Sequence, residues 1–236
     1  MGLAINYDLS APNTLPIRTV RSWLEQTRAF ALELGCKEVD PVLKAGPKYG
    51  LGRRLLSDPR RTGIESLLGY LDPRRGYAVE IWPGEGCESA HFGLCQYPRR
   101  VNYYGRVCRP EFARGWAFSG MCKTQYAHEH GWEHFLWCHR TIIRLLEFLR
   151  DLGMGVEVRD EGEYWETRSE DKLRAALGCY DRFMAAVAGA CKDVAGAAAP
   201  GLAVESPIFA RKDFEKLEAE GWPEIGRQLS KPSSPP

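Results

Sequence analysis

The alternation of apolar and polar residues along this chain predicts both strands and amphipathic helices. Strict alternation is typical of a half-buried strand, whereas apolar residues three or four positions apart form one buried face of a helix. By these criteria, strands are expected at 3–9, 36–44, 77–82, 87–96, 116–126 and 154–160. Helices are expected at 16–34, 64–71, 130–152, 169–191 and 212–220.

Residues that favour helix ends support several of these boundaries. Gly35 and Gly153 each follow an expected helix, at the position where a glycine often ends one. Ser169 is expected to cap the N-terminus of the next helix. Glu170 and Asp171 then lie in the first turn of that helix, where negative charge is favourable.

The order of these elements predicts an α+β fold. Hairpins mixed with crossover connections predict a mixed, largely antiparallel sheet with helices packed on one face. Two β-α-β segments suggest ferredoxin-like units, although no sequence repeat accompanies them. We expect a single α+β domain at 1–200, with a long basic excursion at 45–76. Residues 201–236 are expected to form a C-terminal appendage with a short helix and a flexible tail.

Composition and charge narrow the class of partner. The 236 residues include 44% hydrophobic and 27% charged residues, and the formal net charge is +1. A near-neutral chain without a nucleic-acid-binding signature argues against a nucleic-acid partner. Charge is uneven, however, because the segment 44–109 holds twice as many Lys and Arg as Asp and Glu. Arginine pairs interleaved with tyrosines can hold phosphates and stack bases, so that alternative stays open for this segment.

The sequence also bears on the compartment. No apolar run approaches the roughly 20 residues that a membrane-spanning helix needs. The first residues lack the basic start and apolar core of a secretory signal. We therefore expect a cytoplasmic protein with no membrane segment. The eight cysteines form no C-x-x-C pair and are expected to be reduced, mostly buried thiols.

Histidines point to the first candidate site. Four of the five fall within the segment 128–139. His130, His134 and Cys138 are spaced four residues apart, which places them on one face of a helix. Imidazole and thiolate are common zinc ligands, so zinc is the one candidate cofactor. His139 lies on the apolar stripe of the same helix, where a neutral histidine hydrogen-bonded in the core is the alternative.

The same segment contains candidate catalytic residues. His128 and Glu129 follow the strand expected at 116–126, and His134 comes soon after. A histidine has a pKa near neutrality, which suits a general acid or base. These three residues are the basis for a hydrolase hypothesis.

A second set of residues suggests ligand binding. Lys123 and Gln125 alternate on the face of their strand that points away from the expected core, where Lys123 could bind an anion and Gln125 could orient it. Tyr164 and Trp165 lie in the acidic loop 160–166 and complete the candidate ligand-binding residues. Carboxylates in that loop could instead bind a cation, although they lack the spacing of an EF-hand.

Three stretches of this region resemble other proteins. They are Cys122-Lys123-Thr124-Gln125-Tyr126-Ala127, a helix with His139 and Ile142-Ile143, and Asp160-Glu161-Gly162-Glu163-Tyr164-Trp165. Together they resemble bacterial proteins known only as hypothetical, over about residues 115 to 175. The resemblance implies a bacterial, cytosolic protein and no particular activity.

The sequence alone does not assign a function. It favours a binding or regulatory domain for a small anionic ligand or a protein partner, because no nucleophile–base pair or complete metal-ligand set is visible. The alternative is a hydrolase that uses the segment 128–139, with or without zinc. The sequence does not indicate the oligomeric state or the role of the arginines at 53–75.

Overall fold

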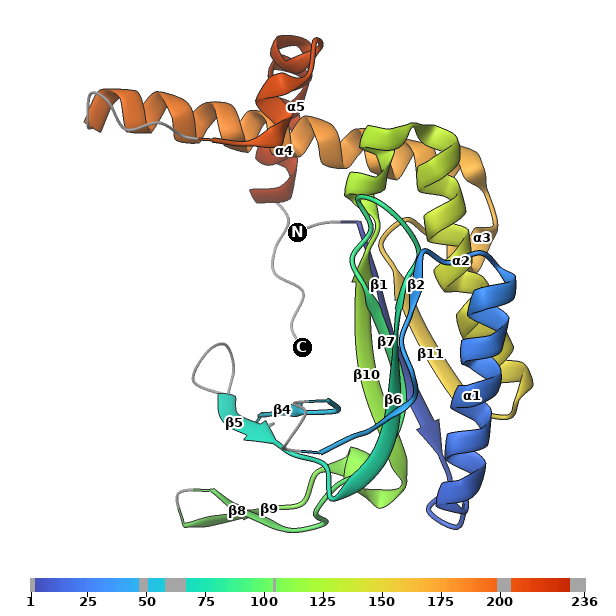
Figure 1. Ribbon diagram of the computed structural model, residues 1–236. Coiled ribbons are helices and arrows are strands. Elements are labelled where there is room, and N and C mark those ends of the chain that lie inside the picture. Colours follow the sequence, from blue (N-terminus) through green and yellow to red (C-terminus); the bar gives the residue numbers. More distant parts are fainter. Residues whose placement is uncertain (1–2, 47–50, 58–66, 104, 199–204, 230–236) are drawn as a thin grey trace. The chain divides into compact units, whose positions relative to one another are not determined.

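The computed structural model describes residues 3–46, 51–57, 67–103, 105–198 and 205–229 (Figure 1). The chain divides into two compact units. The sheet unit comprises Ala4–Asp160, and the helical unit comprises Glu161–Pro236 with Met1–Leu3. The boundary between the units follows Asp160, and the long helix expected at 169–191 lies in the helical unit.

A seven-stranded sheet is the centre of the sheet unit. All pairings within it are antiparallel. The strand order is β11-β1-β10-β7-β6-β2, and β3 also pairs with β6. The strands are β1 (Ala4–Ala11), β2 (Glu38–Val39), β3 (Leu43–Lys44), β6 (Arg75–Trp82), β7 (Ala90–Gln96), β10 (Trp116–Lys123) and β11 (Gly155–Asp160). The strand expected at 36–44 is therefore two short strands, β2 and β3.

Helices α1 (Ile17–Glu33) and α2 (Trp132–Asp151) lie on one face of this sheet (Figure 1). Both bury the apolar stripe that their sequence periodicity predicts. In α1 the stripe includes Val20 and Leu24, and in α2 it includes Phe135 and Ile142. The expected α+β fold, with a largely antiparallel sheet and packed helices, is confirmed.

The connection from β10 through α2 to β11 forms a split β-α-β unit. Both β10 and β11 pair antiparallel with β1, which lies between them, so they are parallel to each other. A strand inserted between two parallel strands is also found in ferredoxin-like units. The ferredoxin-like description of the whole sheet stays a prediction.

The basic excursion expected at 45–76 contains a hairpin. It comprises β4 (Arg54–Ser57) and β5 (Leu67–Leu71), which pair with each other. The helix expected at 64–71 is therefore wrong over Leu67–Leu71, and its first residues lie outside the described part. A second hairpin pairs β8 (Val101–Tyr103) with β9 (Arg106–Cys108), and the 3-10 helix η2 (Glu111–Arg114) precedes β10.

The helical unit contains α3 (Tyr164–Thr167), α4 (Glu170–Ala198), η4 (Pro207–Ala210) and α5 (Phe214–Leu229). The hydroxyl of Ser169 accepts a hydrogen bond from the Lys172 N–H at 3.3 Å, which confirms the predicted cap of α4. Arg211 pairs with Asp181 of α4 at 2.5 Å and with Asp213 at 2.9 Å. The predicted tail, 230–236, lies outside the described residues. No helix in the described part of the chain is long and apolar enough to cross a membrane.

The absence of a side chain at Gly120 allows Tyr7 to pack across the middle of the sheet. Tyr7 and Gly120 are directly opposite in the β1–β10 register. A methyl group added at Gly120 would overlap the Tyr7 ring. That ring stacks on Phe92 with a centroid distance of 5.2 Å, and its hydroxyl donates to the His91 carbonyl at 2.8 Å. Three neighbouring strands are joined by this single side chain.

Gly120→Ala is expected to lower the free energy of unfolding by about 1–3 kcal/mol, because the added methyl group overpacks against Tyr7. Urea denaturation measures the change. Gly46→Ala is the matched control, since a Cβ atom added at Gly46 meets no atom within 4 Å. Equal losses in the two variants would contradict this account of the packing.

Candidate functional site

A buried chain of hydrogen bonds links three segments of the sheet unit. Thr124 follows β10, His139 lies in α2, and Asp160 ends β11. The Thr124 hydroxyl lies 2.9 Å from His139 Nδ1, and His139 Nε2 lies 3.1 Å from the Asp160 carboxylate. Because a carboxylate can only accept, Nε2–H donates to Asp160, and in a neutral ring Nδ1 accepts from Thr124.

These residue types resemble a catalytic triad, but the burial of the group excludes a reaction with a substrate in solution. The His139 and Asp160 side chains are 0% exposed, and Thr124 is also buried. The alternative prediction for His139, a hydrogen-bonded core histidine, is confirmed.

The structure does not bring the predicted catalytic residues His128, Glu129 and His134 together. His128 Nδ1 lies against the carbonyl oxygen of Gln125, and both residues precede α2 in the chain. His134 Nε2 donates to the Glu85 carbonyl at 2.9 Å, and Glu129 is exposed. This geometry offers the hydrolase hypothesis no shared reaction centre.

The predicted zinc ligands are neighbours without forming a metal site. The rings of His130 and His134 are 5.4 Å apart between centroids, and His134 Nε2 lies 3.5 Å from Cys138 Sγ. Among the residues that the structure describes, no group of three or more His, Cys, Asp or Glu side chains is arranged to hold a metal ion. The geometry therefore gives no support to zinc.

The predicted ligand residues Lys123 and Gln125 face different surroundings. Lys123 Nζ lies 3.5 Å from a Glu88 carboxylate oxygen, so a neighbouring negative charge balances it. Gln125 is 1% exposed, and its side-chain oxygen has no hydrogen-bond partner within the described chain. A paired lysine and a buried amide make a weak site for an anion from solution.

The other two predicted ligand residues, Tyr164 and Trp165, lie on α3 of the helical unit. The Arg168 guanidinium lies over both rings, 5.9 Å from the Tyr164 centroid and 5.1 Å from that of Trp165. Cation–π contact of this kind accounts for the two aromatic residues as local packing.

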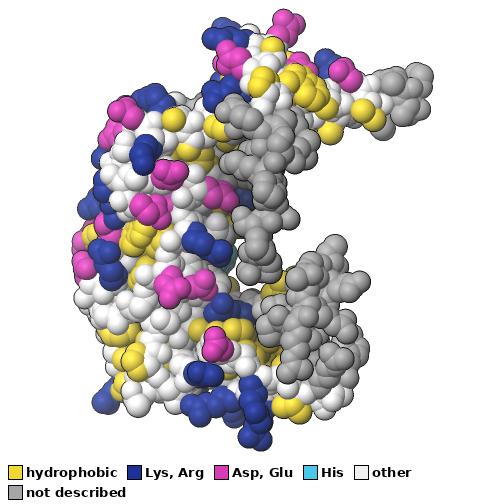
Figure 2. Space-filling view, turned by 180° about the vertical axis from the view of Figure 1, so that it is seen from behind, with side chains coloured by type: hydrophobic (Ala, Val, Ile, Leu, Met, Phe, Trp, Pro, Cys, Tyr) yellow, Lys and Arg dark blue, Asp and Glu magenta, His cyan; other side chains and the backbone are white. Residues whose placement is uncertain are grey.

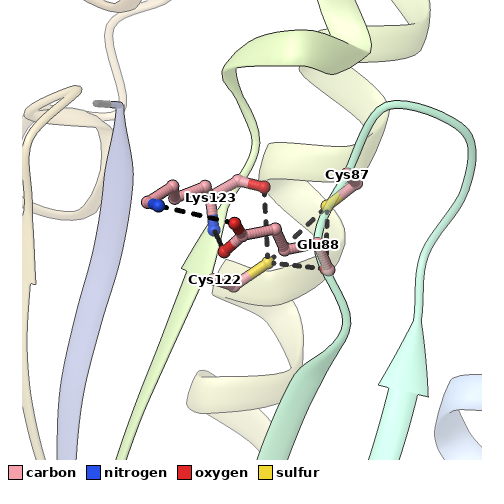
Figure 3. A network of polar contacts seen from close by, with 4 residues as sticks. All are labelled: Cys87, Glu88, Cys122 and Lys123. Carbon is pink, nitrogen blue, oxygen red and sulfur yellow. Dashed lines mark hydrogen bonds and ion pairs between the residues drawn. The ribbon is translucent and has the colours of Figure 1, made fainter. Parts of the chain in front are cut away.

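Three thiols gather beside Lys123 and Glu88. Figure 3 shows the Cys87 and Cys122 sulfur atoms facing each other, 3.6 Å apart. The hydrogen bond between the Cys87 and Cys122 thiols raises the pKa of Cys87 well above its usual range, and Cys87 raises the pKa of Cys138 in the same way. Because a thiol reacts as its thiolate, raised pKa values make Cys87 and Cys138 poor nucleophiles. All eight cysteines are free thiols.

A hollow lined by arginines lies at the opposite end of β10. It has a volume of about 350 Å³, and we call it the arginine hollow. Its lining comprises Arg99, Arg100, Arg109, Pro110, Ala113 and Arg114. The chain between β7 and β8 provides the first two arginines, and the chain from β9 through η2 provides the others. All four arginine side chains are exposed.

Few negative charges balance these four arginines. Arg114 lies 3.7 Å from Glu111, and both side chains are largely exposed, so their pairing is weak. Within the described residues, no acidic side chain forms an ion pair with Arg99, Arg100 or Arg109. Figure 2 shows basic side chains gathered at the lower end of the molecule, the end where β8 and β9 lie in Figure 1.

Aromatic packing fixes the wall of the arginine hollow. The Phe112 ring in η2 meets the Tyr97 ring edge-on at 5.0 Å. The Tyr97 hydroxyl donates to the Gly52 carbonyl at 2.5 Å, and the Arg54 guanidinium lies 4.4 Å from the Phe112 centroid. Burial raises the pKa of the Tyr97 hydroxyl well above its usual range, so this group stays a donor. The arginines are thus carried by a packed scaffold.

Sequence reasoning left open a phosphate-binding role for the arginine-rich segment 44–109, but it did not identify the arginine hollow itself. The signal was present, because the segment 97–114 contains five arginines and a single acidic residue. Within the wider segment 44–109, which holds twice as many Lys and Arg as Asp and Glu, that excess is less marked. Only the folding of η2 beside the β7–β8 connection brings Arg99 and Arg114 to one hollow.

Comparison with known proteins identifies no relative: no family model, curated protein or solved structure matches this chain. The resemblance to hypothetical bacterial proteins therefore stays a prediction. Function has to be inferred from the geometry of the side chains.

His139→Ala is expected to lower the free energy of unfolding by about 3–5 kcal/mol, because it leaves the Asp160 carboxylate buried without its histidine. Urea denaturation at neutral pH measures the loss. His134→Ala is the matched control, since its imidazole is only half-buried, and it should cost about 1 kcal/mol or less. If the two variants lose the same stability, His139 does not have the assigned role.

Cys95 is expected to make the free energy of unfolding depend on pH, because burial raises the pKa of its thiol to about 12. A group with a raised pKa stabilises fully below its unfolded pKa, and that contribution is lost as the pH rises toward the folded value. The wild-type free energy of unfolding should therefore fall from about pH 9 upward by as much as about 1.4 kcal/mol per pH unit more than that of Cys95→Ala. Urea denaturation at pH 8, 9 and 10 measures both curves, and parallel curves would rule this out.

Proposed function

We propose that the sheet unit is a binding domain for an anion that carries several phosphate groups. The observation that carries this proposal is the convergence of Arg99, Arg100, Arg109 and Arg114 on the arginine hollow. Guanidinium groups present their N–H donors in a planar fork that matches a phosphate through two parallel hydrogen bonds. A small anion with several phosphates can engage several of these forks at once.

Electrostatics favours a multiply charged ligand over a single carboxylate. Positive side chains around one hollow repel each other, and three of the four have no acidic partner within the described chain. A ligand with several negative charges relieves this repulsion, and the field of the four arginines also speeds its approach. A single carboxylate would neutralise only part of the charge.

This proposal keeps the function class favoured by the sequence but moves the site. The small anionic ligand was expected near Lys123 and Gln125, where Glu88 already balances the lysine. The hydrolase alternative receives no comparable support, because the candidate histidines engage separate carbonyl groups and the nearby thiols have raised pKa values. The cytoplasmic location stays a prediction from the sequence.

Inorganic tripolyphosphate is a suitable probe, because it has several phosphates and no other recognition group. We expect wild-type protein to bind it in isothermal titration calorimetry at low salt. Arg99→Ala/Arg100→Ala should weaken binding by about tenfold or more, since each charge-assisted hydrogen bond contributes about 1.5–3 kcal/mol.

The matched control removes two arginines elsewhere in the sheet unit. Arg140→Ala/Arg144→Ala changes two exposed residues of α2, and it lowers the net charge by the same amount. It should leave the affinity for tripolyphosphate unchanged within about twofold, apart from the small effect of net charge. No binding by wild-type protein, or equal weakening by both double variants, would overturn the proposed function.

A further inference from the structure

The β4–β5 hairpin presents an unusual pair of exposed apolar side chains. Leu55 and Tyr70 are directly opposite in the pairing register, so they share one face of the hairpin. Leu55 is 47% exposed and Tyr70 is 65% exposed. The Arg53 guanidinium lies 5.9 Å from the centroid of the Tyr70 ring. Arg53 Nε also donates a hydrogen bond to the Asp72 carboxylate at 2.8 Å. An exposed apolar face rimmed by charge is typical of a binding surface.

This hairpin is fastened to the wall of the arginine hollow. Gly52 accepts the hydrogen bond from Tyr97, and Arg54 covers Phe112 of η2. The residues Ala113 and Arg114, which immediately follow Phe112, line the hollow. The exposed face with Leu55 and Tyr70 and the arginines of the hollow therefore belong to one connected part of the sheet unit.

Two further arginines lie along this connection. Arg74 and Arg75 follow β5 by a few residues, and both side chains are exposed. The Arg74 N–H donates to the Gln96 carbonyl at 2.8 Å, and Arg75 Nε donates to the Gln96 side chain at 2.7 Å. Gln96 precedes Arg99 by three positions. Positive charge thus extends beyond the hollow toward the β4–β5 hairpin.

We infer that the phosphate-bearing ligand is a single strand of nucleic acid, with its backbone along the arginines and a base stacked on Tyr70. This inference rests on the proposed function and names its ligand class. Single-strand binding needs a positively charged track for phosphates and an aromatic face for bases. Free polyphosphate would use only the arginines, and a duplex offers no base face to an exposed tyrosine.

The near-neutral net charge of the chain does not oppose this inference. At physiological ionic strength, charges act over a Debye length of about 8 Å. Phosphates at the arginine hollow therefore respond to the local excess of arginine rather than to the formal charge of +1. The charge balance of the whole sequence, which argued against nucleic acid, averages over this local excess.

Fluorescence anisotropy with labelled oligo(dT) and oligo(rU), each roughly 12 nucleotides long, tests the inference on the full chain. The two probes distinguish DNA from RNA as the source of the strand. Binding should weaken as salt rises from 50 to 200 mM, with a slope of log K against log salt of about −3 for four arginine–phosphate contacts. A matched duplex should bind more weakly than the single strands.

Two kinds of variant separate the phosphate contacts from stacking. Arg99→Ala/Arg100→Ala should reduce the magnitude of the salt slope by about 1.4. Tyr70→Ala should weaken binding about fivefold or more without changing that slope, whereas Tyr70→Phe, which keeps the ring, should bind like wild type. Arg140→Ala/Arg144→Ala serves again as the control of equal charge.

The outcomes distinguish this inference from the proposed function. If tripolyphosphate binds in an Arg99- and Arg100-dependent manner but neither single strand binds, the ligand class is wrong and the anion site stands. If Tyr70→Ala binds both oligonucleotides like wild type, or the duplex binds as tightly as the single strands, base stacking on Tyr70 is overturned. If neither tripolyphosphate nor oligonucleotide binds, both proposals fail.

Discussion

The hydrogen bonding of His139 is the constraint on which the histidine-rich end of the sheet unit depends. A side chain with no exposed surface must satisfy both ring nitrogens inside the protein. Thr124 and Asp160 do so, and they come from the segments at the ends of β10 and β11. The position of α2, and the ends of the two strands on either side of β1, are therefore set together by one imidazole ring.

The two ends of β10 differ in how far their polar side chains find partners within the protein. The chain enters β10 from the arginine hollow and leaves it at Thr124, so the strand separates the two regions by roughly 25 Å. Polar side chains at the histidine-rich end mostly have partners within the protein. Lys123 forms an ion pair with Glu88, the Cys87 and Cys122 thiols are hydrogen-bonded, and His134 donates to a backbone carbonyl. The arginine end is polar and positively charged, with charges that the described chain leaves largely unbalanced. Chemistry with an outside partner is therefore expected at the arginine end.

Sequence reasoning succeeded where one long periodic pattern decided the structure. The helices Ile17–Glu33 and Trp132–Asp151 have apolar stripes of several turns, which no strand can share. It failed at Leu67–Leu71, because a five-residue apolar run satisfies either periodicity and only its pairing with β4 decides. The strand expected to reach Tyr126 ends at Lys123, since Thr124 turns inward to His139.

The candidate site was harder to predict than the fold for a related reason. Histidines that lie close together in sequence attract attention, yet their spacing does not show that His134 and His128 bind different carbonyl groups. The arginine hollow is formed within the segment 99–114, by loops and a short 3-10 helix in which no helix or strand periodicity is long enough to read. Arg99 and Arg114 meet only because Phe112 packs on Tyr97.

The central position of β1 also has a consequence for the newly made chain. Its pairing partners extend to Lys123 on one side and to Asp160 on the other, so both of its neighbours in the sheet are synthesised well after β1 itself. Until β10 and β11 are synthesised, both edges of β1 are open to other chains, which is the usual route to aggregation. Asn6, Asp8 and Ser10 alternate along one face of β1. These polar side chains keep one face of β1 hydrated until its partner strands have been synthesised.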